Sequence, residues 1–211
     1  MALLAVLVLL LFQAADLSAV RHADPVPREL AAPVATAIAP GGVKVAVGGN
    51  TLTFWWVNRL LPSAKATAGK PPASWADVDE GSLVGAVKVE RDFRDVRGRV
   101  IRAGTYTLRY GLQPKTSDHL GVSPHRDFLL LSPIAFDKDP EPRGHDGTIE
   151  LSKETIGGSH PAVLSIDPPS ATAAPLSIAT TALGHKGIVF EVPTATGTFR
   201  FGLVLIGKIE A

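Results

Sequence analysis

The side chains best suited to chemistry are concentrated between residues 118 and 146, a stretch that holds three of the six histidines and several carboxylates. The chain has no cysteine, so a zinc, copper or iron ion would need imidazole and carboxylate ligands. His119, His125 and Asp127 fall within one expected loop, and His145 follows. They are the candidate ligands of a divalent transition metal. The alternative is that they are ordinary polar side chains on solvated loops.

Two other motifs invite a chemical interpretation. Asp137, Asp139 and Glu141 alternate like the start of a calcium loop, but prolines stand between and after them where such a loop needs flexible glycine. Ser159 and His160 place a hydroxyl beside an imidazole, yet neighbours in sequence do not reach one another as a triad requires. The segment around Ser159 is predicted to be a turn.

Trp55 is the candidate ligand-binding residue of the expected strand 51–57. Adjacent strand residues face opposite ways, so Trp56 can join the core while Trp55 points outward as a stacking platform for a sugar ring. The alternative is that residues 20–40 or a loop cover Trp55, and the 6% aromatic content favours this cover.

The elements expected to position these residues are short strands. In residues 104–112, Tyr106, Leu108 and Tyr110 alternate with Thr107 and Arg109. Residues 128–131 form an apolar run typical of a strand buried on both faces. The other expected strands are 43–47, 51–57, 83–93, 148–151, 162–166, 176–179, 187–192 and 198–206.

Strand patterning predicts the fold class. No window of helical length after the leader shows a convincing helical period, because Pro, Gly or β-branched residues interrupt each one. Residues 41–211 are predicted to form a single all-β domain, a β-sandwich of roughly nine to eleven short, mostly antiparallel strands. Alternation alone does not separate a sandwich from a barrel.

The N-terminal residues predict export. Residues 2–12 are an unbroken apolar run, about half the length of a membrane-spanning helix. We interpret residues 1–19 as a signal peptide cleaved after Ala19. The run lacks the Lys or Arg that usually precedes such a segment. The alternative is that these residues form a buried N-terminal strand or helix. Residues 20–40 contain four prolines and are predicted to be a linker or surface arm. The absence of cysteines and glycosylation sequons favours a bacterial periplasmic or secreted protein.

Composition excludes several function classes. The formal net charge is +1, and the charged stretch 90–99 alternates in sign, so nucleic-acid binding has no support. Gly 20 and Pro 17 are too few for a low-complexity chain. Nothing after the leader is long and apolar enough to be a membrane span.

Three parts of the sequence resemble segments of known proteins: residues 41–45 together with 54–57, residues 101–108, and residues 119–123 together with 126–130. Together they resemble uncharacterised exported bacterial proteins with no known activity. The resemblance implies export and β structure, and no catalytic residue follows from it.

These observations favour a non-catalytic binding or structural module of the bacterial envelope over an enzyme. Its loops 114–125 and 137–147 would contact a small molecule, a glycan or an envelope protein. One alternative is a metal-dependent hydrolase or metal carrier using the histidine and aspartate loops. A second is a carbohydrate-contacting module using Trp55.

Overall fold

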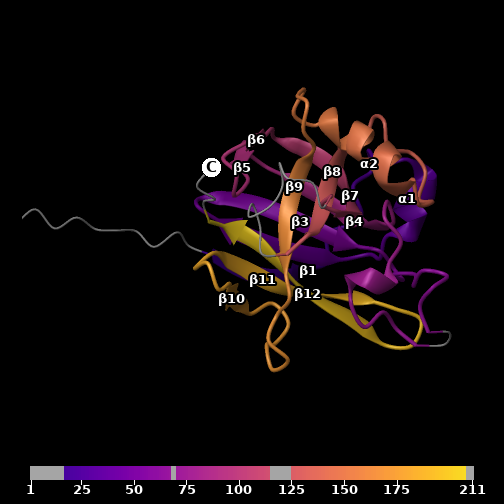
Figure 1. Cartoon of the computed structure of the whole chain (residues 1–211). Helices are drawn as coiled ribbons and strands as arrows, with labels where there is room; N and C mark the ends of the chain where they lie inside the picture. Colours follow the sequence, from indigo (N-terminus) through magenta and orange to yellow (C-terminus); the bar gives the residue numbers. More distant parts are fainter. Residues whose placement is uncertain (1–16, 68–69, 115–124, 208–211) are drawn as a thin grey trace, which may run out of the picture.

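The structure is a computed structural model that describes residues 17–67, 70–114 and 125–207, and most of its elements are strands (Figure 1). No helix in these described ranges is long and apolar enough to cross a membrane. The strands are β1 (Leu17–His22), β2 (Gly42–Val47), β3 (Asn50–Trp56), β4 (Leu83–Val89), β5 (Phe93–Arg94), β6 (Val100–Ile101), β7 (Gly104–Leu112), β8 (Asp127–Pro133), β9 (Ala162–Asp167), β10 (Ile178–Thr180), β11 (Lys186–Pro193) and β12 (Thr198–Ile206). The helices are α1 (Ala32–Ala37), α2 (Gly144–Lys153) and the short 3-10 helix η1 (Trp75–Asp77).

Ten strands form one antiparallel sheet in the order β1-β2-β3-β4-β7-β8-β9-β12-β11-β10, and β5 and β6 pair separately. The sheet curves until β1 contacts β11, which makes a nearly closed barrel. The predicted all-β class is confirmed, but the predicted two-sheet sandwich is wrong. The sheet stays continuous because β12 pairs with β9, through Gly202 opposite Asp167 and Leu203 opposite Ile166.

Curvature arises where the strand pairing shifts. Register shifts occur between Leu83 and Gly85 and between Lys186 and Gly187. A Cβ atom on Gly85 would lie 2.3 Å from the carbonyl oxygen of Trp55, so only glycine allows the strands to approach this closely. Bulges and glycines of this kind bend a sheet toward closure.

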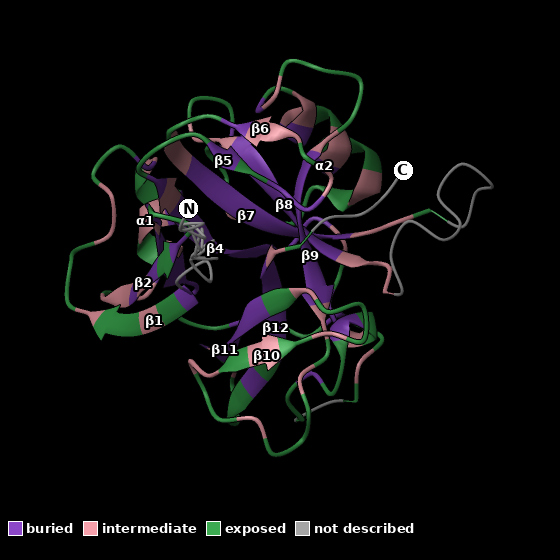
Figure 2. Cartoon of the chain, turned by 90° about the vertical axis from the view of Figure 1, so that its left-hand side faces the viewer, coloured by how far each residue is buried: buried purple, intermediate pink, exposed green. Residues whose placement is uncertain are grey.

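Aromatic rings fill the inside of the barrel. Phe54 and Trp56 stack with their ring centroids 5.4 Å apart, and Phe190 lies 4.8 Å from Trp56. Phe201 contacts Trp56 from β12, at 5.3 Å. Figure 2 shows the central strands as buried, with exposed residues on the edge strands β1 and β10.

One predicted strand is corrected, and two further predictions meet the structure at β1. Residues 148–151, predicted as a strand, lie in α2. Residues 20–40, predicted as a linker or surface arm, contain the second half of β1 and all of α1. β1 begins at Leu17, so the expected cleavage after Ala19 falls inside a strand whose Leu17 is buried opposite Val47. The rest of the expected signal peptide lies outside the described residues.

Helix α2 covers the outer face of the sheet over β7 and β8, away from strands β10–β12 (Figure 1). Hydroxyl groups hold its C-terminal end there. Ser152 donates to the carbonyl oxygens of Leu131, at 2.7 Å, and Ala162, at 3.0 Å, and Thr155 donates to Leu131 at 2.7 Å. These bonds link the helix end to β8 and β9.

A fully buried arginine anchors the segment that precedes α2. Arg109, on the outer face of β7, binds both carboxylate oxygens of Asp137, through Nε at 2.7 Å and Nη2 at 2.8 Å. It also donates to the carbonyl oxygens of Gly81, Asp139 and Glu141. Every N–H donor of the guanidinium is therefore satisfied, which a buried charge requires.

The loop before β4 completes this junction. Gly81 has a φ of +83°, and a Cβ atom there would lie 2.6 Å from the backbone nitrogen of Gly144, at the start of α2. Thr107 donates a further hydrogen bond to Asp137, and Nε of Arg143 lies 3.4 Å from the same carboxylate. The start of α2 is therefore packed tightly against β7 and the loop before β4.

We expect Arg109→Met to lower the free energy of unfolding by about 3–5 kcal/mol, because it leaves the carboxylate of Asp137 buried without its main partner. Urea unfolding measures the change. Arg109→Met combined with Asp137→Leu should recover part of the loss. Arg102→Met, which removes an exposed arginine from its ion pair with Asp92, is the control and should change little. A free energy within about 1 kcal/mol of the wild type for Arg109→Met would contradict this account.

Candidate functional site

The predicted metal ligands have separate partners in the structure. Nε2 of His125 lies 3.2 Å from a carboxylate oxygen of Asp167. Nδ1 of His145 lies 2.6 Å from Glu80. Asp127 accepts a hydrogen bond from the hydroxyl of Tyr110 at 2.7 Å, and His119 lies outside the described residues. Within the described ranges, no three His, Asp or Glu side chains gather in a way that could hold a metal ion.

The alternating carboxylates of the calcium-like motif also have structural partners. Asp137 is buried against Arg109, and the backbone oxygens of Asp139 and Glu141 accept bonds from the same guanidinium. The side chain of Asp139 accepts from the backbone nitrogen of Glu141 at 3.0 Å. The motif therefore serves the junction before α2.

Trp55 lies under the segment that follows β1. It is 3% exposed, and its indole N–H donates to the carbonyl oxygen of Asp24 at 3.3 Å. The ring of His22 meets it edge-on at 5.7 Å. This is the covered arrangement, so Trp55 presents no indole face on which a sugar ring could stack.

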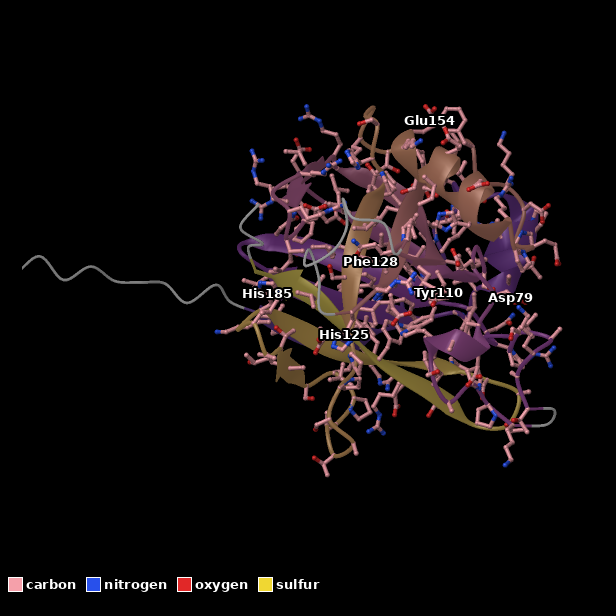
Figure 3. The ribbon with its side chains drawn as sticks, viewed as in Figure 1. Asp79, Tyr110, His125, Phe128, Glu154 and His185 are labelled. Atoms are coloured by element: carbon pink, nitrogen blue, oxygen red, sulfur yellow. The ribbon has the colours of Figure 1, made fainter. Side chains whose placement is uncertain are left out.

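A pocket of about 330 Å³ lies on the outer face of the barrel, between α2, the sheet and the turn before β9. Figure 3 labels Phe128, one of its lining residues, together with Tyr110 and His125. The lining comprises Arg97, Gly111, Leu112, Gln113, Pro114, Phe128, Leu130, His145, Ile149, Lys153, Ser159, His160, Pro161 and Val163.

The floor of the pocket is apolar. Phe128, Leu130 and Val163 form a small hydrophobic cluster separate from the main core, and Ile149 of α2 packs against it. These side chains face outward because Leu129 and Leu131, their neighbours on β8, face the main core. A Cβ atom on Gly111 would lie 2.2 Å from Cδ1 of Leu130, so glycine makes room for Leu130 over β7.

Nitrogen-bearing side chains surround this floor. Arg97 is held by Asp95, 3.2 Å from its Nη2, and by the carbonyl oxygen of Pro161 at 3.0 Å. Burial lowers the pKa of Arg97, although Asp95 opposes the shift. Lys153, His145 and His160 complete the set, and no aspartate or glutamate is among the described residues that line the pocket.

Comparisons of the chain with protein-family models, with curated proteins and with solved structures find no match.

Parts of this pocket could be predicted from the sequence, but their arrangement in space could not. Residues 128–131 were expected to be buried on both faces, and the structure confirms this. That pattern implies that some element covers the outer face, but it does not identify α2. The turn predicted around Ser159 is confirmed, and it borders the pocket.

Tyr110 connects the predicted site residue Asp127 to the barrel interior. Its hydroxyl donates to Oδ1 of Asp127 at 2.7 Å, and its ring stacks on Trp75. Burial raises the pKa of Tyr110, and the hydrogen bond to Asp127 and the charges of Asp127 and Glu80 raise it further. Burial and then the charge of Asp92 raise the pKa of Tyr106, the only other tyrosine.

We expect neither tyrosine to ionise in the folded protein near pH 10, where a free tyrosine is about half ionised. The folded state keeps protons that the unfolded chain loses, so stability should fall as the pH rises above about 10. Ultraviolet difference spectroscopy of the phenolate band, in buffer and in urea, measures this. A native protein that shows one phenolate near pH 10 would contradict a raised pKa for both tyrosines. The Tyr110→Phe variant would then show which of the two tyrosines ionises.

Proposed function

We propose that this chain is an exported binding module whose pocket beneath α2 holds one small, mainly apolar molecule. The observation that supports this proposal most directly is the apolar floor of the pocket on the outer face of the barrel. It is formed by Phe128, Leu130, Val163 and Ile149. Apolar pockets with a few polar groups at their margin are the usual form of small-molecule sites.

The size of the pocket supports a small ligand. Its volume of about 330 Å³ lies at the lower end of the range of roughly 300–1,000 Å³ that such sites occupy. At about 30 Å³ for a water-sized group, it accommodates roughly ten such groups.

The surroundings support a pocket that exists before the ligand binds. The Arg109–Asp137 pair holds the segment before α2, and Ser152 and Thr155 hold the opposite end of the helix. A preformed pocket spares the ligand the entropic cost of ordering its site.

We expect 1-octanol, a neutral probe, to bind the wild type with a Kd below about 1 mM, as measured by isothermal titration calorimetry. Ile149→Trp should abolish this binding, because the larger ring fills the pocket from the helix side. Ile178→Trp, at an exposed position on β10, is the matched control and should bind like the wild type. Absence of saturable binding to the wild type, or equal binding by Ile149→Trp, would overturn the proposal.

Export is the second part of the proposal, and the apolar run of residues 2–12 and the cysteine-free composition support it. When the full chain is expressed in a bacterium with a periplasm, we expect it in the periplasmic fraction with Val20 as its first residue. N-terminal sequencing checks the position. A start at or before Leu17 would move the cleavage site outside β1, and a chain confined to the cytoplasm would refute export.

A further inference from the structure

We infer that the ligand of the pocket beneath α2 is an amphiphilic anion, an aliphatic or aromatic acid whose carboxylate meets the basic margin. This inference rests on the proposed function and deepens it. Its basis is the division of the lining into an apolar floor and a margin of nitrogen-bearing side chains.

The margin consists of four nitrogen-bearing side chains, two of them permanently charged. Arg97 and Lys153 carry positive charge. His145 faces the carboxylate of Glu80 through Nδ1, so it offers a second N–H, at Nε2, only as the imidazolium; His160 also borders the pocket. Their carboxylate partners Asp95, Glu150 and Glu80 do not line the pocket. A bound anion therefore meets the nitrogen side of the Arg97 and Lys153 pairs, where it gains charge-assisted hydrogen bonds.

Lys153 offers the most direct test. It lies in the last turn of α2, its side chain is 30% exposed, and its Nζ lies 2.5 Å from Glu150. Glu150 is 70% exposed and competes with a ligand carboxylate for the ammonium group. Removing the lysine and removing its competitor should therefore change anion affinity in opposite directions.

The experiment compares octanoate, 1-octanol and octylammonium, which share a chain and differ in the charge of the head group. Calorimetry on the whole protein should show octanoate binding about tenfold more tightly than octanol. Octylammonium should bind more weakly than either. Raising the ionic strength should weaken octanoate binding and leave octanol binding unchanged.

Variants then assign the preference to the margin. Lys153→Gln should weaken octanoate binding about three- to tenfold, and Glu150→Gln should strengthen it about two- to threefold. Lys88→Gln is the control. Lys88 lies near the C-terminal end of β4 and, like Lys153, pairs with a glutamate, Glu90. The control substitution causes the same change in net charge away from the pocket and should leave octanoate affinity unchanged.

The outcomes separate this inference from the proposed function. Octanol binding by Lys153→Gln shows that the variant folds, because the apolar floor is intact. Equal affinity for octanol and octanoate, or tightest binding of octylammonium, overturns the anionic ligand and leaves the apolar pocket standing. If no probe saturates the wild type, the proposed function fails as well.

Discussion

The outer face of this barrel depends on one buried ion pair. Arg109 sits in the middle of β7, where alternation turns its side chain away from the barrel interior. A guanidinium in that position must be desolvated and fully bonded, and Asp137 with three backbone oxygens provides those bonds. Because these oxygens come from the segment after β8 and from the loop before β4, satisfying one side chain fixes both segments on the sheet.

The filled interior of the barrel and the anchoring of α2 together explain why the candidate site lies outside the barrel. The interior is filled by the stacked rings around Trp56 and Phe190, and these belong to the main core. On the outer face, α2 covers β8 from a position set by Arg109 at one end and by Ser152 at the other. Phe128 and Leu130 remain between helix and sheet, and they line a pocket rather than a closed core.

The sequence predicted local features well and tertiary ones poorly. The two faces of residues 104–112 follow from alternation, and the structure confirms them, with Tyr106 and Leu108 in the main core and Arg109 outside it. The strand predicted at residues 148–151 is a helix, because hydroxyl bonds to β8 and β9 support α2, and no local pattern reveals those bonds. The Arg109–Asp137 pair and the β9–β12 pairing join residues far apart in sequence, so periodicity could not show them.

The most direct test of the central claim is a methyl NMR titration of the full protein with octanoate. The account predicts saturable shifts at the methyl groups of Ile149, Leu130 and Val163, which line the pocket. The methyl groups of Ile188 and Leu203, fully buried in the main core, should not move. Shifts confined to the core methyl groups, or no shifts at any concentration, would contradict a ligand site beneath α2.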